Sequence, residues 1–67
     1  GWAAGLVVDV ERRESNYGVY YVYKLSPNGA FWVREEEPKY AKGDIVAARV
    51  DAKTGRAKIT KQLRLGR

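Results

Sequence analysis

Apolar and polar residues alternate along most of the chain with a period of two, which is typical of β-strands half buried in a sheet. The first predicted strand covers residues 2–12 and places three aliphatic side chains on one face: Leu6, Val8 and Val10. The polar run Arg-Glu-Ser-Asn at residues 13–16 is expected to end this strand, because none of its side chains belongs in a core.

Four further strands follow from the same alternation, at residues 17–25, 30–35, 45–51 and 56–63. The charged segment before the fourth strand contains a proline, which cannot donate to a β-ladder. Residues 35–44 are therefore expected to form an exposed connection that ends in a turn at Gly43-Asp44. A glycine-containing turn joins the last two strands, and residues 64–67 are expected to be a frayed terminus or, alternatively, a last half-turn.

The Ser-Pro-Asn-Gly segment at residues 26–29 predicts a tight hairpin, because proline presets one turn position and glycine accepts positive φ. With a three-residue loop, one face of the hairpin becomes the core side: Val19, Tyr21, Tyr23, Leu25, Phe31 and Val33. The other face then collects Tyr20, Val22, Lys24, Trp32 and Arg34. A four-residue loop is the alternative, and it would bring Tyr21 and Tyr23 beside Trp32.

A flat sheet of five short strands would expose long edges, whereas a small barrel buries one face of every strand. The sequence therefore predicts an all-β fold, a small five-stranded antiparallel barrel in one domain over residues 1–67. The OB-fold and the SH3-like barrel are the two candidates, and the OB-like barrel is favoured.

The chain contains no cysteine and no histidine, so neither a disulfide framework nor a zinc site is expected. No cofactor is expected, and a reducing cytoplasm is the expected compartment. No apolar run approaches the roughly 20 residues that span a bilayer, so a membrane is not expected among the partners. Because the sequence opens with Gly1 and not with methionine, we expect a domain excised from a larger protein or complex, a processed product, or a chain that begins with the remnant of a tag.

The net charge of +5 is concentrated towards the carboxy-terminal end. Residues 1–48 carry six basic and seven acidic side chains, whereas residues 49–67 carry seven basic side chains and one acidic one. A basic segment on a neutral body is expected of a protein that binds a polyanion. A solvated, solubilising tail is the alternative.

Six of the eight aromatic residues fall within residues 17–32, which is more than one face of a hairpin can bury. Exposed rings stack on nucleobases for roughly 1–3 kcal/mol per base, and neighbouring cations hold the phosphates. Because a duplex hides its base faces, single-stranded RNA or DNA is the expected partner. Rings that merely cover a small core are the alternative. The candidate nucleic-acid-binding residues are Tyr17, Tyr20, Lys24, Trp32, Arg34, Arg49, Arg56 and Lys58.

Residues 42–61 resemble the final hairpin of the RNA-binding OB domains in ribosomal protein and polynucleotide phosphorylase repeats. The shared features are a Gly-Asp turn before an alternating strand, a short turn and a basic last strand. Residues 17–20 are similar to the family's aromatic-Gly-x-aromatic strand start. The resemblance implies RNA binding, with Tyr17 and Tyr20 as stacking rings and Arg56 and Lys58 on the basic strand. The family's longer stretch before the fourth strand is missing, which leaves DNA-binding OB modules and duplex-binding chromatin barrels as alternatives.

An enzyme is not expected, because the chain lacks a nucleophile with a base beside it and the glycine spacing of a phosphate loop. The consecutive residues Glu35, Glu36 and Glu37 would alternate faces in a strand and are expected to form a solvated acidic rim, or to repel phosphate at one end of a groove. A second class of function is an SH3-like barrel for protein interaction or subunit docking. The basic last hairpin disfavours it, because the grooves that bind proline-rich segments are often acidic.

Overall fold

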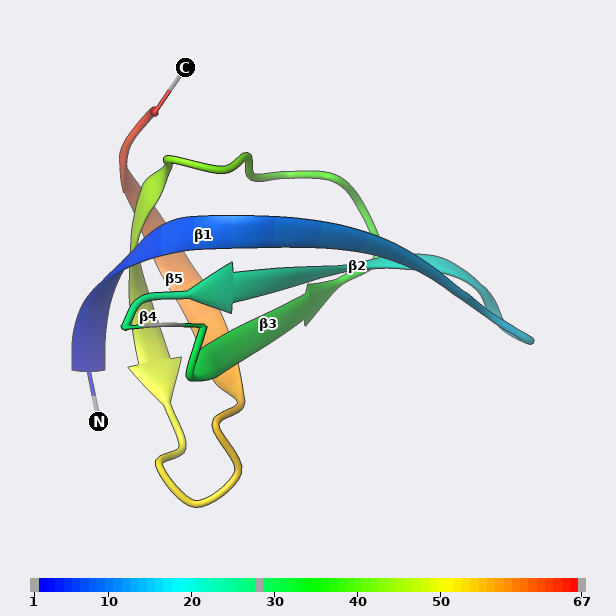
Figure 1. Cartoon of the computed structure of the whole chain (residues 1–67), viewed down its shortest axis with the longest axis horizontal. Helices are drawn as coiled ribbons and strands as arrows, with labels where there is room; N and C mark the ends of the chain where they lie inside the picture. Colours follow the sequence, from blue (N-terminus) through cyan, green and yellow to red (C-terminus); the bar gives the residue numbers. More distant parts are fainter. Residues whose placement is uncertain (1, 28, 67) are drawn as a thin grey trace.

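The computed structural model describes residues 2–27 and 29–66, which form five strands and no helix (Figure 1). The strands are β1 (Trp2–Ser15), β2 (Gly18–Leu25), β3 (Phe31–Glu35), β4 (Ile45–Val50) and β5 (Ala57–Arg64). The predicted all-β class is thereby confirmed. Nothing in the described part of the chain is a helix long and apolar enough to cross a membrane.

The strands form one antiparallel sheet in the order β3-β2-β1-β4-β5. The first three strands follow one another as hairpins, and β4 returns to the other side of β1, which is a Greek-key arrangement. Strand β1 belongs to both halves of the sheet, because residues 2–6 pair with β4 and residues 7–15 pair with β2. Figure 1 shows β1 curving over the other strands and projecting with β2 as a two-stranded ribbon.

The sheet curls until its two edge strands meet, although no complete ladder closes it. Trp32 of β3 forms an isolated parallel bridge with Arg56, the residue just before β5. The amide of Trp32 also donates a hydrogen bond of 2.9 Å to the carbonyl oxygen of Gly55. The predicted five-stranded antiparallel fold is confirmed, and the curled sheet is barrel-like without being closed.

The interior of the barrel is filled by aliphatic side chains around one tyrosine: Val7, Tyr23, Leu25, Val33, Val46, Ala48, Ala57 and Ile59. Strands β2 and β3 pair with Lys24 opposite Trp32 and Tyr23 opposite Val33, so the register of the three-residue loop is right and the four-residue alternative is wrong. One residue of the predicted core face is misplaced. Val19 is 37% exposed, because it lies in the ribbon beyond the end of β3.

Strand β1 differs from its prediction in two ways. It continues through the polar run to Ser15, since that part pairs with β2 and needs no apolar face. A register shift between Val7 and Asp9 also breaks the alternation. Val7 is consequently buried and Val10 packs against the core, whereas Leu6 is 42% exposed. A β-bulge of this kind is invisible to a strict period of two.

The connection over residues 35–44 is exposed at residues 36–39, as predicted, whereas its second half packs against the barrel. The Tyr40 ring lies edge-on to Tyr23, with 5.3 Å between the ring centroids. Asp44 is fully buried, and its carboxylate accepts hydrogen bonds from the Ala41 amide (3.0 Å), the Gln62 side chain (2.8 Å) and the Gly66 amide (2.9 Å).

The described residues of the predicted frayed terminus, 64–66, are exposed, but two of them are held by hydrogen-bonded contacts. Arg64 pairs with Ile45 as the last residue of β5, and Gly66 is held by its bond to Asp44. Arg67 lies outside the described residues. The physical reason is the buried carboxylate of Asp44, which needs donors and recruits them from the chain end.

Candidate functional site

The outer face of the β1–β2–β3 sheet carries the rings and cations that the hairpin register predicts. Residues paired across a ladder share a face, which yields three cross-strand rows: Asp9, Lys24 and Trp32; Glu11, Val22 and Arg34; Arg13 and Tyr20. Val22 differs from its neighbours in being only 5% exposed, although it points away from the barrel interior. The longer side chains around it therefore cover an apolar floor.

Tyr20 and Arg34 form a cation–π pair on this face. The guanidinium carbon of Arg34 lies 4.0 Å from the centroid of the Tyr20 ring, a distance at which the plane of the cation covers one face of the ring. Such a contact holds Arg34 in a defined position while its donors remain free to bind a ligand in the plane. The charge of Arg34 is exposed, since the residue is open to solvent.

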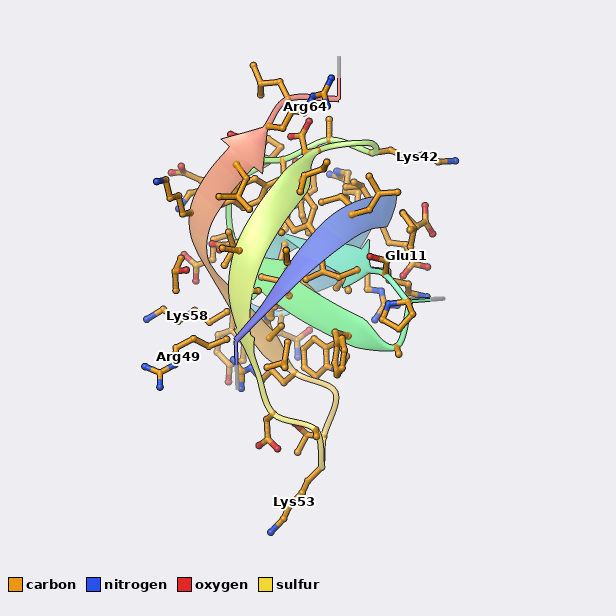
Figure 2. All side chains as sticks on the ribbon, turned by 90° about the vertical axis from the view of Figure 1, so that its left-hand side faces the viewer. Glu11, Lys42, Arg49, Lys53, Lys58 and Arg64 are labelled. Carbon is orange, nitrogen blue, oxygen red and sulfur yellow. The ribbon has the colours of Figure 1, made fainter. Side chains whose placement is uncertain are left out.

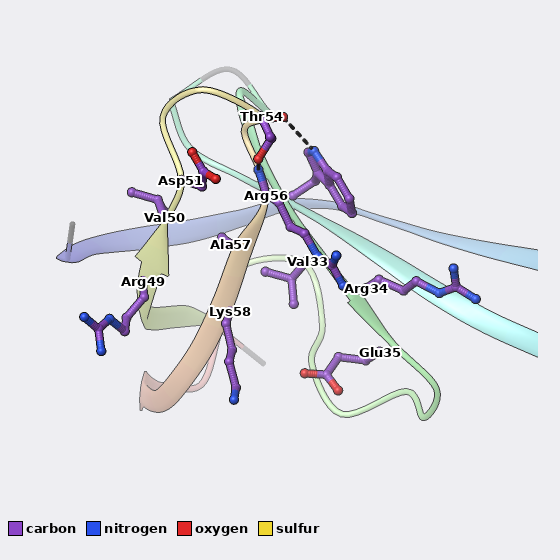
Figure 3. Close-up of a pocket in the computed structure, with 11 residues that line it drawn as sticks. Val33, Arg34, Glu35, Arg49, Val50, Asp51, Thr54, Arg56, Ala57 and Lys58 are labelled. Carbon is purple, nitrogen blue, oxygen red and sulfur yellow. Dashed lines mark hydrogen bonds between the residues drawn. The ribbon is translucent and has the colours of Figure 1, made fainter.

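Trp32 is the second ring, and the loop between β4 and β5 fixes it in place (Figure 3). Its indole nitrogen donates a hydrogen bond of 3.4 Å to the carbonyl oxygen of Thr54, and the guanidinium carbon of Arg56 lies 5.7 Å from the ring centroid. The loop is itself braced, because the Gly55 amide donates to the carbonyl oxygen of Asp51 (2.8 Å). The half-buried indole on β3 is therefore positioned by the β4–β5 loop and by Arg56.

Two hollows meet at Trp32, Arg34 and Arg56. The smaller one, which we call the Val22 hollow, has a volume of ≈410 Å³ and is walled by Tyr20 and Trp32 above Val22, with cations on its rim: Arg13, Lys24, Arg34 and Arg56. The larger one, which we call the β3–β5 groove, has a volume of ≈1010 Å³. Because the three shared residues line both, the hollow and the groove form one continuous surface.

The β3–β5 groove is predominantly basic. Arg49 and Lys58 are cross-strand partners on the outer side of β4 and β5, and Figure 2 shows their side chains extending in the same direction. Two cations from adjacent strands thus lie side by side on the groove. The groove also contains Glu35 and Asp51, so its negative charge lies at two separate points. The acidic run of residues 35–37 lies at the end of β3 with Arg34 and Lys39.

Glu11 holds two of the cations of the outer face. Its carboxylate lies 2.8 Å from the guanidinium of Arg13 and 3.4 Å from the ammonium of Lys24. The hydrogen bond from Arg13, followed by that from Lys24, lowers the pKa of Glu11 below its ordinary value. The carboxylate thus lies between two cations, where an external phosphate oxygen would also be attracted.

Seven of the eight residues predicted for the site line these two hollows: Tyr20, Lys24, Trp32, Arg34, Arg49, Arg56 and Lys58. Tyr17 does not line either hollow. It is 98% exposed beside the turn that joins β1 to β2, at the end of the ribbon. Of the two rings that the family resemblance assigns to stacking, Tyr20 lines the Val22 hollow and Tyr17 lies outside both hollows.

Three residues of the site were absent from the prediction. Arg13 was missed because β1 was expected to end before it, and Val22 because its position on the outer face hides its role as a floor. Thr54 contributes a backbone carbonyl, for which the side chain gives no signal. Strand pairing alone could have found Arg13, since it lies opposite Tyr20 once β1 is extended.

No group of three or more His, Cys, Asp or Glu side chains within residues 2–27 and 29–66 is arranged to hold a metal ion. The chemistry available on this face is therefore that of rings, guanidinium groups and ammonium groups. Comparison with protein-family models, with curated proteins and with solved structures finds no match.

Proposed function

We propose that this protein binds single-stranded nucleic acid along the Val22 hollow and the β3–β5 groove. One observation carries the proposal: two aromatic rings, each with an arginine beside it, line a hollow that opens into a basic groove. Rings and guanidinium planes stack on bases of any sequence, and the cations of the groove attract the phosphate backbone. The chain acts as a binding module and not as an enzyme.

The location on the barrel supports the same function. OB-folds bind oligonucleotides on the face of the second and third strands and at the loop between the last two strands. Here Tyr20 and Trp32 come from β2 and β3, and Thr54 and Arg56 come from the loop that follows β4. RNA is slightly favoured over DNA because of the resemblance of residues 42–61 to RNA-binding domains. The lack of cysteine favours a cytoplasmic setting.

Tryptophan fluorescence tests the proposal directly. The chain contains two tryptophans, so the Trp2→Phe variant reports on Trp32 alone. Titration at low salt with single-stranded RNA, single-stranded DNA and duplex DNA should quench the indole with both single strands and much less with the duplex. Stronger quenching by the duplex would favour a chromatin-type barrel. If none of the three ligands quenches the indole or binds in a filter assay, the proposed function is wrong.

A further inference from the structure

The Val22 hollow differs from an open stacking surface because it has a floor, two walls and a charged rim. We infer that it is a subsite for one nucleotide, in which the base stacks on the guanidinium plane of Arg34 and the phosphate is held by Arg13 and Lys24. The inference rests on the proposed function and specifies it further. It implies that a single nucleoside phosphate binds without being part of a longer chain. It also implies that a single-stranded nucleic acid inserts one of its nucleotides into the hollow.

The dimensions and lining of the hollow fit a small ligand. Its volume of ≈410 Å³ lies in the lower part of the range of small-molecule sites, about 300–1,000 Å³. The floor is the apolar side chain of Val22, and the ring of Trp32 forms one wall. An apolar floor with rings beside it suits the faces of a base, whereas the cations at the rim suit a phosphate that stays in contact with water.

The base is expected to meet Arg34 before it meets Tyr20. The guanidinium already covers one face of the Tyr20 ring at 4.0 Å, so that face is closed to direct stacking. Bases also stack on guanidinium planes, and here the plane is held by the ring behind it. Tyr20 is accordingly a positioning residue for Arg34. A lysine at position 34 would keep the charge but offer no plane.

The two cations proposed to hold the phosphate are held by Glu11 in the absence of ligand. The carboxylate of Glu11 gathers the guanidinium of Arg13 and the ammonium of Lys24, at 2.8 Å and 3.4 Å. Both of these cations also line the hollow. A phosphate brings more charge than a carboxylate and accepts more charge-assisted hydrogen bonds, so it can draw both cations towards the hollow. A nucleoside without phosphate lacks this contribution.

The first test is competition by small ligands. Adenosine monophosphate, adenosine and inorganic phosphate are each titrated into the Trp2→Phe protein and into its complex with a labelled single-stranded oligonucleotide. The nucleotide should quench Trp32 and displace the oligonucleotide at concentrations at least about tenfold lower than either fragment, since it uses both stacking and phosphate contacts. Equal potency of phosphate and nucleotide would overturn the inference, because the rim alone would then account for binding.

The second test distinguishes the contribution of the planar guanidinium group of Arg34 to nucleotide binding from the contribution of its charge. Arg34→Lys should weaken nucleotide binding by about tenfold, with the same salt dependence as the unmodified protein. Arg64→Lys is the matched control, because Arg64 lies on β5 away from the hollow, and it should change nothing. If Arg34→Lys binds the nucleotide as well as the unmodified protein, base stacking on Arg34 is wrong.

The third test fills the hollow. Val22→Phe places a larger side chain on the outer face and should abolish nucleotide quenching, whereas Val19→Phe, at an exposed position of the same strand outside the hollow, should leave it intact. Thermal unfolding verifies that both variants are folded. If the unmodified protein binds the oligonucleotide but not the nucleotide, or if folded Val22→Phe still binds the nucleotide, the subsite is wrong and the proposed function stands. If neither ligand binds the folded protein, the proposed function itself fails.

Discussion

The amide of Trp32 donates a hydrogen bond to the carbonyl oxygen of Gly55, and this 2.9 Å contact joins edge strand β3 to the loop between β4 and β5 at the centre of the proposed binding surface. The indole of the same residue is bonded to Thr54, the residue before Gly55. The closure of the barrel and the position of the binding ring therefore depend on one contact region. A change that separates β3 from the β4–β5 loop should affect stability and ligand binding together.

Gly55→Ala is predicted to weaken this contact region. Gly55 has a φ of +77°, and an added methyl group would lie 2.8 Å from the carbonyl oxygen of Ala30. Strained backbone of this kind costs of the order of 1–3 kcal/mol, and the steric contact adds to it. Gly18→Ala is the control, since Gly18 also has positive φ (+121°) but faces open space. In chemical denaturation, equal losses for the two variants would show that the Ala30 contact is unimportant.

Trp32→Ala should weaken binding of a single-stranded oligonucleotide by about 1–3 kcal/mol, because one stacking ring is lost. The slope of affinity against salt should stay nearly the same, because no cation is removed. Tyr17→Ala provides the comparison: Tyr17 lies outside both hollows and should have a smaller effect. A larger effect at Tyr17 than at Trp32 would favour the family resemblance over the geometry as a guide to the site.

Arg56→Ala and Lys58→Ala should each make binding less dependent on salt. Both residues line the β3–β5 groove, and each phosphate contact that is lost lowers the salt slope by about one unit. Lys42→Ala removes the same charge from an exposed position outside the groove. Binding isotherms at several salt concentrations distinguish these cases. Identical slopes for Lys42→Ala and Lys58→Ala would mean that the protein attracts phosphate only through its net charge.

Glu11→Gln should strengthen oligonucleotide binding, because it releases Arg13 and Lys24 from a competing carboxylate. The same pair has a pH signature. Since the pKa of Glu11 is lowered in the folded protein, its contribution to stability is present above the ordinary glutamate pKa and is lost as the pH falls through the lowered value. Unfolding curves measured down the acidic range should therefore be less pH-dependent for Glu11→Gln. Unchanged affinity would show that Glu11 does not compete with phosphate.

Asp44→Ala should lower the free energy of unfolding by about 1–3 kcal/mol, because three donors lose their buried acceptor. Asp44→Asn keeps one acceptor oxygen in place and should cost less. Amide hydrogen exchange at Gly66 supplies a local readout, since its amide is bonded to this carboxylate. Slow exchange at Gly66 in Asp44→Ala would contradict the view that Asp44 anchors the end of the chain.

The hairpin of β2 and β3 could be predicted down to its register, because period-two alternation and a glycine loop determine which side chains share a face. The bulge in β1 could not, since one extra residue reverses the alternation without changing composition. The burial of Asp44 was also hidden, because its donors come from residues as distant as Gly66. In the site, ring positions followed from local pattern, whereas the Arg34–Tyr20 contact and the role of Thr54 depend on tertiary structure.

The contact of Trp32 with Gly55 and Arg56, which is the seam between β3 and the start of β5, links ligand binding in the groove to the rigidity of the barrel. A nucleic-acid strand bound in the groove would contact both sides of this seam and hold them together. Trp32 and Arg34 lie on one side, and Arg56 and Lys58 lie on the other. A ligand that binds only when β3 and the β4–β5 loop are in contact stabilises that contact against opening by an amount that grows with the logarithm of the ratio of ligand concentration to Kd. Deuterium uptake at the Trp32 amide should then slow as ligand is added, so the exchange rate of this amide would report the fraction of protein that has ligand bound.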